Sequence, residues 1–195
     1  MKICTREPVL KEKSRGEVLL LHGQKFTSET WEAKCPTLQF LGAAGYRAVA
    51  VDLPNFGDST KVDVADEKRG SFIAELIKAL KLTSPVIISP SMSGSFSLPF
   101  LFDQPDTMPP RARGFVPVAP VQTGAYSSKF SVSKIKTAIV TGDKDTVIGP
   151  AARKNLAALP NAKDFLMENA GHPAYLSDPD MWHTILFTFL HAVFK

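Results

Sequence analysis

The sequence predicts an α/β protein with a mostly parallel central sheet and helices on both of its faces. Short apolar runs alternate along the chain with longer amphipathic segments, and this alternation is typical of βαβ units. Hydrophobic residues make up 44% of the chain and charged residues 22%, as in a globular protein. The 195 residues contain no internal repeat and no linker long enough to divide them, so we expect one domain over residues 1–195.

The predicted strands share a short apolar run bounded by turn residues. They are EVLLL (17–21), YRAVAVD (46–52), PVIIS (85–89), GFVPVA (114–119), KTAIVTG (136–142) and KDFLME (163–168). The predicted helices cover residues 28–44, 66–82, 91–102, 150–159 and 179–194. Pro36 should interrupt or restart the first of them. Only a short segment separates Ala119 from the strand near Lys136, so any cap over the sheet is limited to one small helix and a loop.

Charge, cysteine content and hydropathy exclude several classes of protein. The net charge of +4 is spread over scattered positive residues with no aromatic ladder, which argues against a nucleic-acid interface. Cys4 and Cys35 fit no metal or redox spacing, so we expect reduced thiols, no metal site and a cytoplasmic location. No stretch of about 18 apolar residues occurs, and the first residues contain no signal-peptide core, so we expect no membrane partner.

A run of alternating serines, VIISPSMSGSFSLPF (86–100), follows the third strand. A nucleophile on a tight strand-to-helix turn tolerates only small neighbours two residues before it, and two and three residues after it. Ser91 satisfies this requirement, with Ser89 before it and Ser93 and Gly94 after it, whereas Ser89, Ser93 and Ser95 each have a bulky residue nearby. A helix cap is the alternative role for Ser91. The sequence therefore predicts Ser91 as the nucleophile.

An acid and a histidine follow Ser91 in the order that α/β-hydrolases use. The strand KTAIVTG runs into Asp143-Lys144-Asp145, and KDFLME runs into a loop that ends at His172. Both residues thus lie beyond the carboxyl ends of successive strands, where they can activate a serine hydroxyl. We prefer Asp145 to Asp143 as the acid because it lies farther along the loop, and we expect Asp143 to bind the backbone of its own turn.

Backbone N–H groups should stabilise the oxyanion of the tetrahedral intermediate. The N–H of Met92 follows the nucleophile at a helix N-terminus, where the dipole favours negative charge. The second donor should come from the loop LHGQKF, as the N–H of Gln24 or alternatively of Lys25. We interpret His22 as a structural residue, and His183 and His191 as surface or packing residues of the last helix.

Six segments carry a resemblance to a known family: LLLHGQKFTSETW, GYRAVAVDLPNFGDS, VIISPSMSGSFSLPF, GFVPVAP, TGDKD and NAGHPAYLSDPDMWHT. From about residue 18 onward the chain resembles the α/β-hydrolase domain-containing protein 14 family, which includes a CIB-like hydrolase associated with the transcription factor TFIID. The resemblance implies the α/β-hydrolase fold and the triad Ser91, Asp145 and His172.

The resemblance also implies a serine hydrolase acting on small acyl esters, or an acyltransferase that moves acyl groups from protein lysine to coenzyme A. It implies no bound cofactor and a transcription-factor partner, and with that partner a nuclear as well as cytoplasmic location. The chain departs from the family because only about 17 residues precede the first strong strand, so its N-terminal strands should be shortened or missing. The alternative function is a non-catalytic binding protein that keeps the hydrolase shape.

Overall fold

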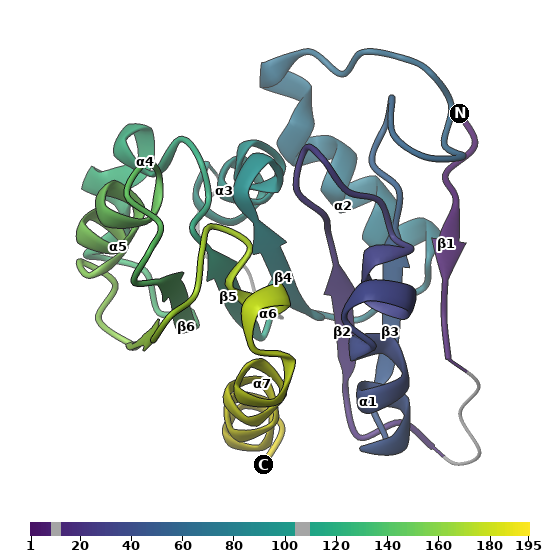
Figure 1. The fold of residues 1–195 in the computed structure, drawn as a ribbon. Coiled ribbons are helices and arrows are strands. Elements are labelled where there is room, and N and C mark those ends of the chain that lie inside the picture. The colour runs from purple at the N-terminus through teal and green to yellow at the C-terminus, as the bar shows by residue number, and fades with distance from the viewer. Residues whose placement is uncertain (9–12, 104–109) are drawn as a thin grey trace.

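Seven strands form one sheet in the order β1-β3-β2-β4-β5-β6-β7 in the computed structural model, which describes residues 1–8, 13–103 and 110–195 (Figure 1). The strands are β1 (Thr5–Arg6), β2 (Glu17–Leu20), β3 (Arg47–Val51), β4 (Val86–Pro90), β5 (Gly114–Val118), β6 (Lys136–Gly142) and β7 (Ala162–Met167). All neighbouring pairs are parallel except β1 and β3, which pair antiparallel. This arrangement confirms the mostly parallel sheet.

Strand β2 has β3 on one side and β4 on the other. The chain therefore leaves β2 in one direction, returns across it and continues in the opposite direction through β4. In open parallel sheets, ligands bind at such a switch point, beyond the carboxyl ends of the two strands. The loops that follow β2 and β4 contain Gln24 and Ser91, so the topology brings these two predicted site segments to one edge of the sheet.

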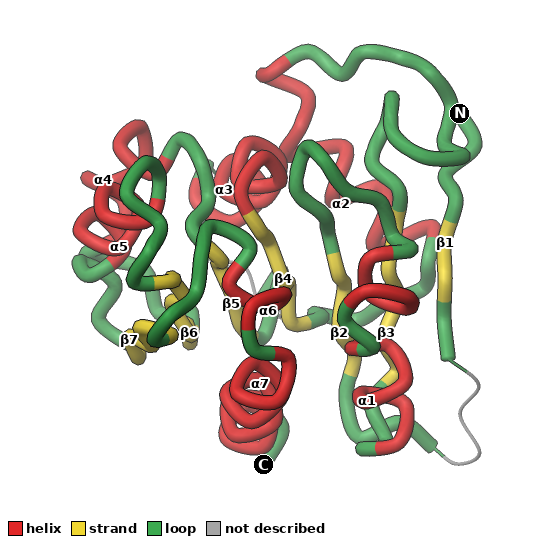
Figure 2. Tube along the Cα trace, viewed as in Figure 1, coloured by secondary structure: helices red, strands yellow, loops and turns green. Residues whose placement is uncertain are grey.

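Helices cover both faces of the sheet (Figures 1 and 2). They are the π-helix η1 (Thr30–Lys34), the 3₁₀ turns η2 (Asp66–Lys68) and η3 (Ser91–Ser93), and the α-helices α1 (Thr37–Ala43), α2 (Arg69–Ala79), α3 (Gly94–Phe102), α4 (Thr123–Phe130), α5 (Gly149–Leu156), α6 (Ala174–Ser177) and α7 (Pro179–Val193). Side chains of α1 and α7 pack in one core cluster, and those of α2, α3 and α5 pack in the other. None of the described helices combines the length and the apolar character needed to cross a bilayer.

Alternate residues along the strands pack in the two core clusters. Along β2, Val18 and Leu20 pack with Trp31 and Trp182 in the first cluster, while Leu19 packs in the second. All of these side chains are fully buried. Because both faces of a parallel sheet are covered, its inner strands are apolar at nearly every position, which is why the sequence shows them as continuous apolar runs, whereas the edge strand β7 exposes Lys163 and Asp164.

Each predicted strand and helix is present in the structure, which also contains short elements that the sequence did not predict. The helix expected over residues 28–44 is divided at Cys35 and Pro36 into η1 and α1, as Pro36 predicts. Before β2, the described residues form the two-residue strand β1, which agrees with a shortened N-terminal region. The short helix α6 after His172 was not predicted, and α4 alone occupies the segment between β5 and β6.

Candidate active site

Ser91 lies in the strained turn that directly follows β4, as the first residue of η3. Its φ angle is +50°, in the left-handed region that non-glycine residues rarely adopt. The turn is held tightly against the loop after β5: the Val121 N–H donates to the Ser91 carbonyl at 3.0 Å. A Cβ atom on Gly94 would approach both Pro120 and Val121 to 2.7 Å, so this turn requires a glycine three residues after the serine. The backbone at Ser91 therefore has the form of a nucleophile elbow.

The neighbouring serines bond to one another or to the backbone. The Ser89 hydroxyl lies 2.7 Å from that of Ser97 and 3.1 Å from that of Ser93, and all three side chains are buried. Ser95 donates to the carbonyl of Met92 at 2.9 Å. These hydroxyls have partners beneath the turn, so Ser91 differs from the other four serines of the run in facing a histidine.

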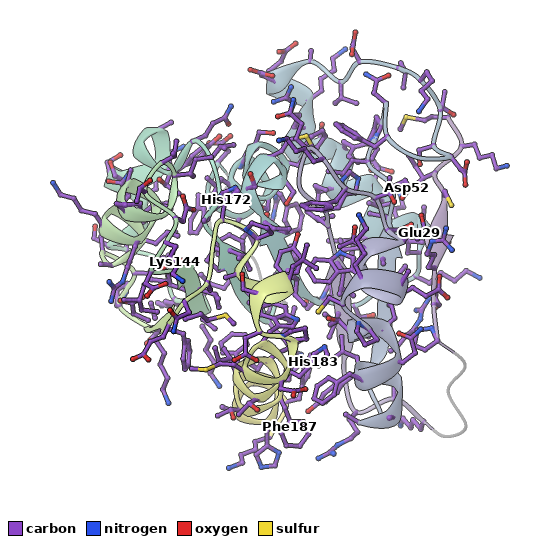
Figure 3. The ribbon with its side chains drawn as sticks, viewed as in Figure 1. Glu29, Asp52, Lys144, His172, His183 and Phe187 are labelled. Carbon is purple, nitrogen blue, oxygen red and sulfur yellow. The ribbon has the colours of Figure 1, made fainter. Side chains whose placement is uncertain are left out.

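Ser91, His172 and Asp145 form a continuous chain of hydrogen bonds. The Ser91 Oγ atom lies 2.8 Å from His172 Nε2, and His172 Nδ1 lies 2.5 Å from Asp145 Oδ2. The residues follow three different strands, β4, β7 and β6 respectively, and meet because the carboxyl ends of parallel strands share one edge of the sheet. The imidazole side chain is about one-third exposed, at 34%, so a substrate can reach it from solvent. Figure 3 shows His172 near this edge.

The Asp145 carboxylate is buried and saturated with donors. Its Oδ1 atom accepts from the N–H groups of Val147 and Ile148, and its Oδ2 atom accepts from Gly149 N–H as well as from His172. Burial raises the pKa of Asp145, but the hydrogen bonds from His172 and from the backbone outweigh it and hold this pKa below its ordinary value. An ionised Asp145 fixes the proton of His172 on Nδ1 and leaves Nε2 free to accept the serine proton.

Asp143 does not bind its own turn, contrary to the expectation from sequence. Its Oδ1 atom accepts the N–H of Ala170 at 3.0 Å, 27 residues away in the loop that carries His172. In the acid loop, Asp145 accepts the N–H groups of Val147 and Ile148. Asp143 therefore does not cap this loop.

The loop after β2 is fixed by His22, which is fully buried. His22 Nε2 accepts the N–H of Leu53 at 2.9 Å, so Nδ1 carries the proton and donates to the carbonyl of Gly23, also at 2.9 Å. The Gly23 carbonyl and the Gln24 N–H belong to one trans peptide and point in opposite directions. Because His22 holds the carbonyl, the Gln24 N–H points away from His22. A Cβ on Gly23 would lie 3.6 Å from the Ser91 Cβ, so this peptide borders the serine.

The described residues contain one group that resembles a metal site. Ligand atoms of Cys4, Asp52 and Asp58 lie within 4.8 Å of one another. The buried Asp52 carboxylate, however, accepts the N–H groups of Ser28 at 2.7 Å and Asp58 at 3.0 Å. Asp52 therefore joins two loops, and we assign the group a structural role.

A groove of about 540 Å³ lies apart from the triad. It runs between α1 and α7 and is lined by Phe40, Ala43, Ala44, Asp180, His183, Thr184, Phe187 and Thr188. In Figure 3, His183 and Phe187 lie on α7, well away from His172. Since none of the triad residues lines this groove, the hydrogen-bond geometry at Ser91 is the better guide to the reacting position.

Comparisons with known proteins agree with this architecture. Human ABHD14B, which carries the provisional name protein-lysine deacylase, is 44% identical over 186 residues that cover 93% of this chain and 86% of the relative. ABHD14A of Rattus norvegicus is 40% identical over 93% of this chain and 74% of its own length. No protein-family model matches the chain.

A solved structure shares the fold as well as part of the sequence. The CIB-like hydrolase of Thermoplasma acidophilum superposes with a TM-score of 0.86 at 26% identity, over 97% of this chain and 92% of the other. Together with the identity to the curated relatives, this similarity establishes the family. The chain belongs to the α/β-hydrolase domain-containing protein 14 (ABHD14) family and is a serine hydrolase of the α/β-hydrolase fold.

Proposed function

We propose that the protein cleaves small acyl groups from esters or amides through the triad Ser91, His172 and Asp145. The observation that carries the proposal is the chain of hydrogen bonds of 2.8 and 2.5 Å from Ser91 through His172 to Asp145. A serine hydroxyl is a weak nucleophile unless a base accepts its proton, and the base works best when an acid orients it. A serine that only capped a helix would have no need of this second and third residue.

The reaction proceeds in two halves. Ser91 Oγ attacks the acyl carbonyl while its proton passes to His172 Nε2, and the resulting oxyanion accepts hydrogen bonds from the N–H groups of Gln24 and Met92. Collapse of the intermediate expels the alcohol or amine, which takes the proton from His172, and leaves an ester on Ser91. Water or a second acceptor then attacks this ester and loses its proton to His172. The acyl product leaves as the bond to Ser91 Oγ breaks, and His172 returns the proton to Oγ, which restores free Ser91.

We propose an acylated lysine side chain of a protein as the natural substrate class. Two features support it: the name of the human relative, and the single small helix α4 between β5 and β6, which leaves little cover over a bulky substrate. Coenzyme A is a proposed acyl acceptor in place of water. We also propose a transcription-factor partner, and with it a nuclear as well as cytoplasmic location. A pull-down from nuclear extract tests this proposal.

Hydrolysis of an acetyl ester by the wild type and by Ser91→Ala tests the proposed reaction. We expect turnover by the wild type and a loss of at least about 10³-fold in the variant, because the remaining oxyanion donors cannot replace the nucleophile. Equal rates in the two proteins would contradict it. A folded wild type that captures a protein partner and hydrolyses no ester would favour the non-catalytic binding function instead.

Acyl chain length tests the proposed substrate size. With so short a segment between β5 and β6, added methylenes should find no apolar pocket, so kcat/KM should fall as the acyl chain lengthens. A series of esters from acetyl to octanoyl measures this trend. A preference of about 10-fold or more for octanoyl over acetyl would show that a covered apolar channel exists.

A further inference from the structure

The loop that carries the acid and the loop that carries the base are joined at a point that is not part of the triad. Asp143 Oδ1 accepts the N–H of Ala170 at 3.0 Å, and the N–H of Lys144 donates to the carbonyl of Ala170 at 2.9 Å. Two consecutive residues of the acid loop thus hold both hydrogen-bonding groups of a single residue in the histidine loop.

This clamp lies close to both catalytic side chains. Asp145 comes two residues after Asp143, and His172 comes two residues after Ala170. Ala170 is fully buried, and a Cβ on Gly142 would approach its carbonyl oxygen to 2.2 Å. The two loops are therefore closely packed at this point. Any change in the spacing of the loops here is passed directly to the 2.5 Å contact between His172 and Asp145.

The histidine loop contains a strained turn that benefits from such a tether. Asn169, the residue before Ala170, has a φ angle of +57°, in the left-handed region. A side-chain bond to the next N–H holds this conformation from outside the turn. Within the described residues, the side-chain hydrogen bonds between the acid loop and the histidine loop are this one and the Asp145–His172 pair itself.

We propose that Asp143 is a positioning residue that sets the distance and orientation between His172 and Asp145, an inference that rests on the proposed acyl-transfer function. The carboxylate acts as a hydrogen-bond acceptor for the Ala170 N–H and does not touch the substrate or Ser91. Its role is distinct from a local turn cap, since the N–H groups of Val147 and Ile148 are already bound by Asp145.

Three variants separate positioning from charge. Asp143→Asn keeps an acceptor oxygen for the Ala170 N–H and loses the charge, whereas Asp143→Ala loses both. Glu168→Ala is the matched control, because Glu168 is an exposed acid in the same histidine loop and makes no side-chain hydrogen bond within the described residues. We expect kcat to fall between about 10-fold and about 100-fold in Asp143→Ala with KM nearly unchanged, since a small misplacement of catalytic groups has effects of this size. Asp143→Asn should restore most of the lost kcat, and Glu168→Ala should match the wild type.

A spectroscopic measurement tests the same claim without turnover. The proton in the short hydrogen bond between His172 Nδ1 and Asp145 should give a far-downfield ¹H resonance in the wild type. It should persist in Asp143→Asn and Glu168→Ala, and broaden or disappear in Asp143→Ala. The proposal is overturned if Asp143→Ala keeps both the resonance and wild-type kcat, if Asp143→Asn is as impaired as Asp143→Ala, or if Glu168→Ala is equally impaired. If the wild type shows no Ser91-dependent turnover, the proposed function fails, while the resonance still decides whether Asp143 positions the pair.

Discussion

Replacing Asp145 by Asn tests the acid of the triad with almost no change of shape. The carboxylate has four donors around it: Val147 N–H and Ile148 N–H on Oδ1, and Gly149 N–H and His172 on Oδ2. An amide has one acceptor oxygen and one NH₂ group. If the NH₂ replaced Oδ1 it would meet two N–H groups, whereas in place of Oδ2 it meets one, so the second orientation is favoured.

With the NH₂ group in the position of Oδ2, His172 adopts the tautomer that cannot accept the proton of Ser91. An NH₂ group beside His172 Nδ1 needs a lone pair on that nitrogen, which moves the imidazole proton to Nε2, opposite Ser91 Oγ at 2.8 Å. Nε2 can then no longer accept the serine proton. The same substitution in other Ser-His-Asp triads lowers kcat by about 10⁴-fold, which corresponds to about 5.4 kcal/mol in the activation free energy. The NH₂ group facing Gly149 N–H should also lower the free energy of unfolding by about 1–3 kcal/mol.

Ester hydrolysis under saturating and subsaturating substrate measures the first effect, and urea unfolding measures the second. Glu168→Gln is the matched control, since it makes the same chemical change in an exposed side chain of a neighbouring loop. A folded Asp145→Asn enzyme that kept more than about a tenth of the wild-type kcat would refute the reasoning, because His172 would then work without an ionised partner.

Two further predictions concern stability. Thr141 is buried and its Oγ1 atom has no hydrogen-bond partner within the described part of the chain, so Thr141→Val should raise the free energy of unfolding by about 1 kcal/mol. Calorimetry should show a Tm higher by about 2–4 °C, and a lower Tm would mean that the hydroxyl has a bound partner. Burial lowers the pKa of His22, outweighing its bond to Gly23 and the charge of Asp52, and burial likewise lowers the pKa of His183. As the pH falls below about 6.5 the unfolded chain binds protons that the folded protein does not, so the free energy of unfolding should fall from about pH 8 to about pH 5. Urea titrations across this range check the sign, and a rise in stability toward acid would contradict it.

The positions of the strands, and the proximity of the acid and the histidine that follow two of them, can be predicted from local sequence patterns. A parallel strand with both faces buried is apolar at nearly every position, so the segment KTAIVTG predicts a strand over residues 136–142, where the structure has β6 (Lys136–Gly142). Because successive parallel strands end at one edge, an acid and a histidine placed just after β6 and β7 are brought together without any information about their side-chain contacts.

Features that depend on distant partners could not be predicted in this way. A carboxylate in a turn, such as that of Asp143, can bind the N–H groups of its own loop or those of another, and only the folded chain shows that Ala170 is its partner. The two residues of β1 carry no apolar run, and their pairing with β3 depends on the whole sheet edge. The serine run was ambiguous for a related reason: alternation is a strand pattern, yet Ser93 and Ser97 lie four residues apart on a helical path, where both reach Ser89.

Covalent labelling by a fluorophosphonate tests the central claim, that Ser91 is the activated nucleophile, most directly. The probe phosphorylates a serine only when a neighbouring base accepts its proton, so labelling reports the Ser91–His172 pair without a known substrate. We expect one adduct per chain, mapped by peptide mass spectrometry to the segment that contains Ser91, and no adduct in Ser91→Ala or, on the same timescale, in His172→Ala. Equal labelling of the wild type and Ser91→Ala, or an adduct on a different serine, would contradict the assignment.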